Sequence, residues 1–268
     1  MNQRNTKTES KTDTTVKSVN RGELNQFLAE NLQISKINDY CPNGLQVEGV
    51  AQIKLLVSGV TASLELIEAA IALKADALLV HHGYFWRGES PCLVGHKFAR
   101  IKKLIDHQIN LYAYHLPLDL HAQWGNNVQL ARVLELQLEG TFAEQNLACY
   151  GRAKNLQLRT VGDLSRWIEA KLERTPLLIG SPDQPLGRIA WCTGAAQNFL
   201  ADAIQVGAGV YLSGEISEPT VHLARESGVA YLACGHHATE RYGVQALGQA
   251  IAQQFGIVTQ FVDIPNPV

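Results

Sequence analysis

Apolar runs typical of buried strands alternate along the chain with segments of helical spacing. In the first half, strands are predicted over residues 53–57, 77–80 and 109–114, with helices over 63–73 and 96–107 between them. Strands separated by helix-length segments favour parallel strands joined by crossover helices. The pattern therefore predicts an α/β fold with a mainly parallel sheet.

The second half of the chain repeats this order. Strands are predicted over residues 188–191, 209–212 and 229–233, with helices over 198–206 and 218–226 between them. In both halves the first strand ends at a glycine turn and the later strands run into polar tips. The repeat predicts two α/β domains of related topology.

A helix cap near the start of the chain indicates where ordered structure begins. Asn20 can cap a helix with Glu23 three residues on, so ordered structure is expected to begin there. The residues before it are polar and rich in Thr and Lys, which is typical of disorder and not of a signal peptide or membrane anchor. We expect a disordered tail over 1–19, a first domain over 20–125 with 257–268, and a second domain over 126–256.

The composition indicates an ordinary soluble globular protein, with 46% hydrophobic and 18% charged residues among 268. A net charge of -2 does not indicate nucleic-acid or membrane binding, although it leaves room for a local basic groove. The five cysteines are widely spaced, and no Cys-x-x-Cys pair occurs. This spacing favours a reducing cytoplasm over a disulfide framework or a zinc knuckle. Phosphate-loop and Gly-x-Ser-x-Gly nucleophile motifs do not occur in the sequence either.

Three short segments carry histidines and carboxylates at predicted strand ends, where open parallel sheets bind ligands. Nitrogen and carboxylate donors without a cysteine suit a Zn, Mn or Fe site used for chemistry. Adjacent histidines at a strand end serve two neighbouring ions more easily than one, so more than one ion is expected. The three segments are His81–Gly83, His115–Asp119 and Gly235–Glu240.

A single histidine is more often a hydrogen-bonding residue than a metal ligand. We assign His96, His107, His121 and His222 to that class, and expect His237 either to support the ligands or to contact a substrate. The three segments taken together favour a metal, because burying several titratable groups is costly unless a cation compensates.

An aromatic run follows the first histidine pair. Tyr84, Phe85 and Trp86 could form a stacking wall for a flat ring, or equally a lid or a subunit contact. Three charged residues nearby could meet a phosphate or take part in acid–base chemistry: Arg87, Glu89 and Lys97.

Four motifs in order resemble the GTP cyclohydrolase I type 2 homologue family, also called Nif-three-like. The similarity runs from about Asn20 to Pro267, and the chain lacks the extra middle domain of longer relatives. The motifs are DYCPNGLQVEG at 39–49, HHGYFWRGE at 81–89, HLPLD at 115–119 with GNN at 125–127, and GHHATER at 235–241.

This resemblance implies a dinuclear metal site between two α/β domains and a ring-shaped homohexamer. It implies two divalent ions per subunit, for which Zn, Fe, Mn and Ni are all suitable. His115 would stand beside the pair as a further ligand or a proton carrier, and Glu240 would bridge the ions. The implied ligands are His81, His82, Asp119, His236 and Glu240.

The leading hypothesis is a divalent-metal-dependent hydrolase of GTP cyclohydrolase type, acting on a nucleotide or a modified or damaged base through a metal-activated water. His115 or His237 would carry protons. The alternative is a non-catalytic, ring-shaped metal-binding protein with a regulatory role or a protein or DNA partner. Metal storage or chaperoning is a third interpretation. All three place the protein in the cytoplasm, and none requires a membrane.

Overall fold

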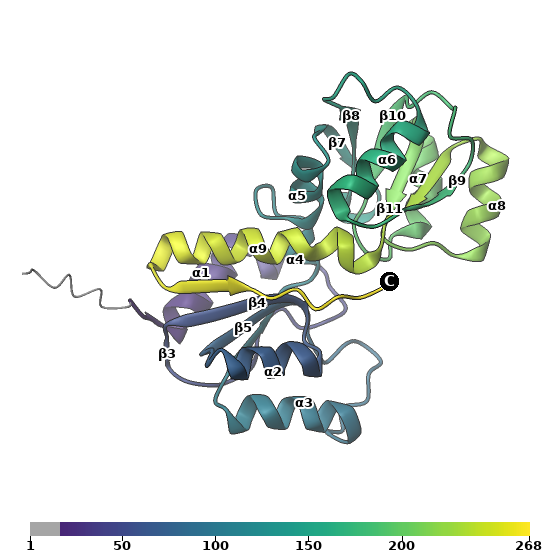
Figure 1. Ribbon diagram of the computed structural model, residues 1–268. Coiled ribbons are helices and arrows are strands. Elements are labelled where there is room, and N and C mark those ends of the chain that lie inside the picture. Colours follow the sequence, from purple (N-terminus) through teal and green to yellow (C-terminus); the bar gives the residue numbers. More distant parts are fainter. Residues whose placement is uncertain (1–16) are drawn as a thin grey trace, which may run out of the picture.

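The apolar strands predicted in the two halves of the chain form two separate sheets. In the computed structural model, which describes residues 17–268, each sheet and its helices make one lobe (Figure 1). The prediction of two α/β domains of related topology is confirmed. Most of the predicted tail, residues 1–16, lies outside the described residues. Val19, at its end, is buried and pairs with Ile53.

The first sheet is mainly parallel. Four of its five strands, β13, β4, β5 and β6, run parallel, and β2 pairs with β6 in the antiparallel sense at one edge. The bounds are β2 Gly44–Val47, β4 Leu55–Thr61, β5 Ala77–His82, β6 Asn110–Ala113 and β13 Val258–Phe261. A two-stranded ribbon lies beside them, formed by β1 Val19–Asn20 and β3 Gln52–Ile53.

Helices cover both faces of this sheet (Figure 1). Alternate residues of β4 and β5 point to opposite sides, so Leu56 and Leu79 pack toward one helix pair and Val57 and Val80 toward the other. The pair α1 Arg21–Leu32 and α9 His236–Phe255 covers the first side, and the pair α2 Leu64–Ala72 and α3 Gly95–Asp106 covers the second. The short η1 Ile34–Lys36 follows α1.

Helix α1 begins where the sequence predicted. The Asn20 side chain accepts a hydrogen bond from the Gly22 backbone at 2.8 Å, and the Asn20 backbone donates to Glu23 at 3.4 Å. This capping box satisfies N–H groups that lack a partner within the helix. Helix α9 packs on β4 and β5 through Val244, Leu247 and Ile251, although the expected bounds count it with the second domain. Those bounds stay a prediction.

The second sheet combines a parallel centre with antiparallel flanks. Strands β10, β11 and β12 are parallel, whereas β7, β8 and β9 pair in the antiparallel sense. Only a short turn containing η2 Glu144–Asn146 joins β7 to β8, and such a connection permits only an antiparallel pair. The bounds are β7 Leu136–Phe142, β8 Ala148–Ala153, β9 Leu177–Ile179, β10 Arg188–Trp191, β11 Ala208–Ser213 and β12 Ala230–Ala233.

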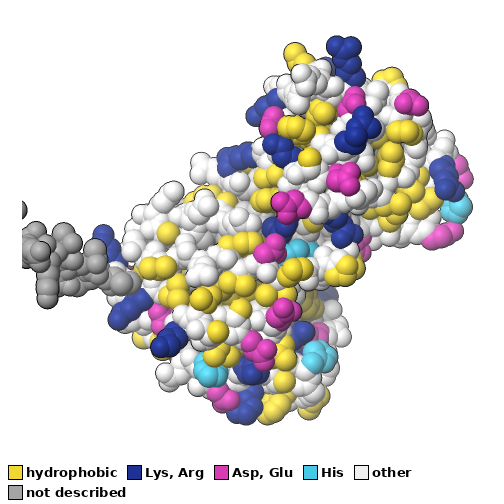
Figure 2. All heavy atoms as spheres, viewed as in Figure 1, with side chains coloured by type: hydrophobic (Ala, Val, Ile, Leu, Met, Phe, Trp, Pro, Cys, Tyr) yellow, Lys and Arg dark blue, Asp and Glu magenta, His cyan; other side chains and the backbone are white. Residues whose placement is uncertain are grey.

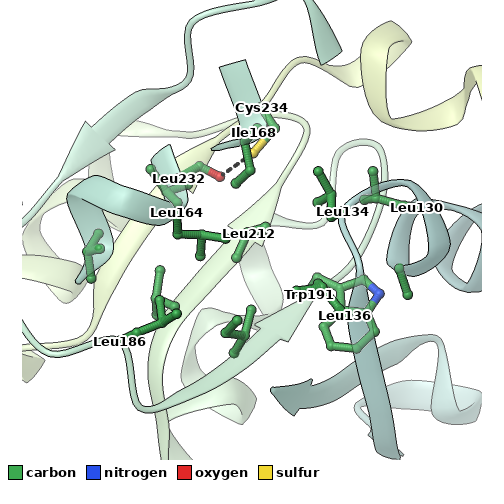
Figure 3. Close-up of a cluster of buried hydrophobic side chains, with 14 of the residues drawn as sticks. Leu130, Leu134, Leu136, Leu164, Ile168, Leu186, Trp191, Leu212, Leu232 and Cys234 are labelled. Atoms are coloured by element: carbon green, nitrogen blue, oxygen red, sulfur yellow. Dashed lines mark hydrogen bonds between the residues drawn. The ribbon is translucent and has the colours of Figure 1, made fainter. Parts of the chain in front are cut away.

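Helices also cover both faces of the second sheet. On one face, Leu164 and Ile168 of α6 belong to one buried cluster with Trp191, Leu212 and Leu232 from the parallel strands (Figure 3). The Trp191 indole donates a hydrogen bond to a backbone carbonyl at 3.1 Å, so its polar group is satisfied inside this core. One face carries α5 Asn126–Val133 and α6 Val161–Leu172, and the other carries η3 Gln197–Phe199, α7 Leu200–Gln205 and α8 Glu218–Ser227.

The carboxyl ends of the central strands of both sheets meet at one cavity. Thr61 and His82 line it from the ends of β4 and β5, Thr193 lines it from the loop after β10, and His236 lines it from the start of α9, which follows β12. The repeated topology therefore brings two sets of strand ends together, where open α/β sheets bind ligands.

The surface view agrees with the near-neutral composition. Lys and Arg side chains are interspersed with Asp and Glu over both lobes on the face in Figure 2. Within residues 17–268, no helix combines the length and the apolar character needed to cross a membrane.

Candidate metal centre

His81 and His82 are the last two residues of β5. The Nδ1 atom of His81 lies 2.9 Å from the Tyr114 carbonyl oxygen, and that of His82 lies 3.1 Å from the Thr61 hydroxyl. Because each Nδ1 has a partner, each Nε2 is left for the cluster. Fixing one ring nitrogen in this way sets the tautomer and the orientation of a metal-binding imidazole.

Glu240 divides its two carboxylate oxygens between two sets of histidines. Its Oε1 lies 3.5 Å from His81 Nε2. Its Oε2 lies 3.2 Å from His82 Nε2 and 3.1 Å from His236 Nε2. His236 and Glu240 share a face of α9 because they are four residues apart.

Asp119 completes the set beside Oε1 of Glu240. It ends the short helix α4 Leu116–Asp119, and its Oδ1 lies 3.6 Å from His81 Nε2. The Asn126 amide donates to this oxygen at 2.8 Å and orients the carboxylate. Two groups of donors result, one of His81, Asp119 and Glu240 and one of His82, His236 and Glu240.

These donor spacings fit coordination. Two donors each about 2.1 Å from one ion lie about 3.0 Å apart at a right angle and about 3.4 Å apart at a tetrahedral angle. The Nε2-to-oxygen distances in the two groups run from 3.1 to 3.6 Å. Glu240 Oε2 is also buried without a hydrogen-bond partner, although two imidazole nitrogens lie close to it. This cluster of His, Asp and Glu residues could bind metal ions.

The charged groups of the cluster shift one another strongly. Burial lowers the pKa of His81 and His236, but Glu240, with Asp119 beside His81 and Glu215 beside His236, outweighs burial and raises each pKa to about 9. Burial and the neighbouring histidines lower the pKa of His82 to about 3. Burial favours protonated Glu240, yet the histidines hold its pKa well below its usual range. A cation can neutralise these carboxylates in place of protons.

Glu215 orients His236 from the second lobe. Its Oε1 lies 2.7 Å from His236 Nδ1, just beyond the end of β11. Such carboxylate–histidine pairs fix the ligand ring and raise its basicity. Glu215 follows one of the predicted strands at a polar tip, which was a possible signal, but the sequence analysis did not identify it as a partner of His236.

His115 lies beside the cluster and is held by Asp39. Its Nδ1 is 3.0 Å from Asp39 Oδ1, while Asp39 Oδ2 accepts hydrogen bonds from the Leu116 backbone and the Asn43 side chain. Burial acts to raise the pKa of Asp39, but these contacts and the His115 charge lower it to about 2. The ring centroid of His115 is 5.0 Å from that of His81. Asp39 was part of a recognised motif, but sequence reasoning gave it no role.

The structure brings six of the expected site residues together and places three elsewhere. His237 forms a 2.7 Å contact with Asp263 and joins neither donor group. Tyr84 is buried, and its hydroxyl donates to the Ala62 carbonyl at 2.6 Å. The ammonium of Lys97 lies 4.7 Å from the ring centroid of Phe85. Those that meet are His81, His82, His115, Asp119, His236 and Glu240.

A cavity of about 590 Å³ opens onto the cluster between the lobes. From the aromatic run, only Trp86 lines it, with its ring centroid 5.0 Å from that of His115. Tyr40 lines the same side, and Thr193 and Phe199 line it from the second lobe. The cavity is large enough for a small heterocyclic molecule.

The chain is similar to known proteins over nearly its whole length. A relative from Pseudomonas aeruginosa named GTP cyclohydrolase 1 type 2 homolog is 52% identical over 237 residues, which make up 88% of this chain and 94% of the relative. A relative of the same name from Vibrio cholerae is 49% identical and covers 93% of this chain and 100% of its own length.

Solved structures agree with this similarity. Protein ybgI, described as of unknown function, superposes with a TM-score of 0.88 at 44% identity, over 93% of this chain and all of its own. TTHA1606 from Thermus thermophilus gives a TM-score of 0.80 at 30% identity over the same shares. Residues 19–267 match the family described as Duf34/NIF3 (NGG1p interacting factor 3). The resemblance inferred from the motifs is confirmed, and the chain belongs to the DUF34/NIF3 family.

Proposed function

We propose that this protein is a divalent-metal-dependent hydrolase that acts on a nucleotide or on a modified or damaged base. The observation that carries the proposal is the division of the Glu240 carboxylate, whose two oxygens face different imidazoles. A carboxylate in this arrangement suits a bridge between two cations. In this proposal the two ions, drawn from Zn, Fe, Mn or Ni, are held by His81, His82, Asp119, His236 and Glu240 in the cleft between the lobes.

The side chains of the chain itself would position the reactants and move protons. Paired cations at such a site lower the pKa of water and polarise the attacked carbon. His115 keeps one ring nitrogen on Asp39, so its other nitrogen is free to accept or donate a proton in the cavity. Trp86 offers an aromatic surface beside this imidazole. His237 is the weaker candidate for proton transfer, because its ring contacts Asp263.

The assembly and compartment belong to the same proposal. We expect a toroidal homohexamer, as the family resemblance implies, and light scattering of the purified protein tests it. All five cysteines are unpaired, which agrees with a reducing cytoplasm. A small nucleotide is the expected partner, together with other copies of the chain.

Elemental analysis of protein purified without added metal, followed by turnover of a nucleotide panel on the same sample, tests this function. We expect about two divalent ions per subunit and hydrolysis that stops after chelation. His82→Ala should abolish turnover, whereas His222→Ala should not, because His222 contacts only the exposed Glu218 outside the cluster. Turnover that survives chelation or the His82→Ala substitution would rule out a metal-dependent hydrolase at this site. A loaded, inactive protein that captures a protein or DNA partner would favour the non-catalytic alternative.

A further inference from the structure

We propose that the cavity takes an uncharged planar heterocycle, a free base or nucleoside, in preference to a nucleoside triphosphate. The inference rests on the proposed function and narrows its substrate class. Three independent features of the cavity carry it: the charge of its lining, the use of its backbone N–H groups and the placement of its aromatic rings.

The lining is poor in positive charge. Among the described residues that line the cavity, Arg87 is the sole Lys or Arg, whereas four are carboxylates. Two divalent cations would bring this lining close to neutral and leave little to balance a triphosphate. Arg87 is also partly committed, since its guanidinium donates to the Asp39 carbonyl oxygen at 3.3 Å. The carboxylates are Asp39, Asp119, Glu144 and Glu240.

Three backbone N–H groups in the loop after β10 are not available to a phosphate. In α/β sheets, phosphates bind loops at strand ends through free backbone N–H groups. Here the N–H of Thr193 donates to the Asn127 side chain at 3.0 Å, and that of Ala196 donates to Ser213 Oγ at 3.1 Å. The Gly194 N–H between them donates to the Thr239 hydroxyl at 3.1 Å. These three donors are therefore already used within the protein.

In the strand-end loops of the first lobe, several backbone N–H groups also have acceptors within the protein. The N–H of Ala62, after β4, donates to the His82 carbonyl at 2.9 Å. The N–H of His115, after β6, donates to the Asn43 side chain at 2.7 Å. The next N–H, of Leu116, donates to Asp39 at 3.0 Å. A phosphate entering here would meet a carboxylate and occupied donors.

Aromatic rings line the cavity from both lobes. Tyr40 and Trp86 lie on the first-lobe side with centroids 5.6 Å apart, and Phe199 lines the cavity from the second lobe. The Trp86 indole donates to the Gly83 carbonyl at 3.2 Å, which fixes the ring. Every heterocyclic base has a flat face that can stack on such rings, so this wall suits a base whatever its phosphorylation state.

Calorimetric titration of the metal-loaded protein with guanosine, GMP and GTP tests the inference. We expect guanosine to bind at least tenfold more tightly than GTP, with GMP between them. Equal or tighter binding of GTP would overturn the inference, and so would the lack of saturable guanosine binding. The binding order is separate from turnover. Hydrolysis of GTP without guanosine binding would support the hydrolase and contradict the preference for an uncharged base. Guanosine binding without any hydrolysis would support that preference and contradict the hydrolase.

Two variants at one position test the aromatic wall. Trp86→Ala should weaken guanosine binding about tenfold, because stacking of one base on an aromatic side chain commonly contributes that much. Trp86→Phe keeps a flat ring and should retain most of the affinity. Circular dichroism checks that both variants fold. Equal affinity of wild type and Trp86→Ala for guanosine would show that Trp86 does not contribute to binding and would count against a stacked base.

Discussion

The side-chain amide of Gln145 pairs with both backbone polar groups of Asn38, which belongs to the other lobe. The Asn38 N–H donates to Gln145 Oε1 at 3.0 Å, and Gln145 Nε2 donates to the Asn38 carbonyl at 2.9 Å. Both residues line the cavity, and Gln145 lies in the turn between β7 and β8 with a left-handed φ of 52°. The pair therefore ties the lobes together beside the site.

Gln145→Ala should weaken this tie. Loss of the two hydrogen bonds is expected to lower the free energy of unfolding by about 1–2 kcal/mol. Urea unfolding followed by circular dichroism measures the change. Gln137→Ala, at an exposed position on β7, is the matched control and should shift stability by less than about 0.5 kcal/mol. Equal effects of the two substitutions would mean that the pair contributes nothing.

The two oxygens of Glu240 predict two separable metal subsites. His236→Ala should remove one ion per subunit, because His236 lies near Oε2. Asp119→Asn should remove the other, because Asp119 lies near His81, which faces Oε1. Glu240→Gln should lose both. Elemental analysis after dialysis reads out the stoichiometry. His237→Ala is the control and should keep both ions, since its ring contacts Asp263 instead. Parallel loss of both ions in His236→Ala and Asp119→Asn would contradict separate subsites.

Glu215 should tune the metal affinity of His236. Glu215→Gln removes the charge 2.7 Å from His236 Nδ1 and is expected to weaken binding at that subsite about 10- to 100-fold. Competition with a chromophoric chelator measures the affinity. Glu218→Gln is the control, because Glu218 is exposed and contacts His222 away from the cavity. An unchanged affinity in Glu215→Gln would show that this carboxylate does not support the ligand.

Asp39→Asn tests His115 as a proton carrier. The substitution keeps the shape of the side chain but removes the charge that holds the His115 ring. Under the proposed function, kcat should fall at least about tenfold, because general acid–base catalysis commonly contributes more than that. The metal content should stay unchanged. Loss of metal together with activity would instead indicate that His115 acts mainly as a ligand.

The same variant predicts a change in acid stability. Because the folded pKa of Asp39, about 2, lies below its unfolded value near 3.9, its stabilising contribution is full above about pH 5 and is lost as the pH falls toward 2. In chelator, where metal release plays no part, the free energy of unfolding of Asp39→Asn should therefore depend less on pH in this range than that of wild type. Parallel curves from urea unfolding would contradict the lowered pKa.

The sequence predicted the elements whose signals are local. The capping box at Asn20 and the apolar central strands were found, because capping residues and buried runs are visible in a short window. Strand β7 was missed, since most of its residues are exposed and its apolar pattern is weak. Helix α9 begins at His236 without a clear local signal, because Gly235, with a φ of 96°, precedes it without a side-chain cap.

In the candidate site too, residues with a local signal were predicted and residues without one were not. Histidines and acids at strand ends were recognisable as candidate ligands from their local position. The supporting residues Asp39 and Glu215 were not assigned, because their contacts with His115 and His236 exist only after distant segments meet. The aromatic run follows the candidate ligands directly in sequence. Tyr84 nevertheless packs inward, and of the three aromatic residues in the run only Trp86 lines the cavity. These residues follow β5 in an irregular turn where Phe85 has a φ of 67°, so the alternation of a strand does not set their side-chain directions.

Helix α9 connects two of the cluster's donor residues to the core of the first lobe. Its first turn holds His236 and Glu240, while its body is embedded in the core of the first lobe through Val244, Leu247 and Ile251. His81 and His82 end a strand of the same lobe. If the lobes swing apart, these donor atoms would travel with the first lobe, whereas Glu215 and Asn126, which contact His236 and Asp119, would stay with the second. Under the proposed function, substrate and product would then exchange without separating the residues that hold the ions.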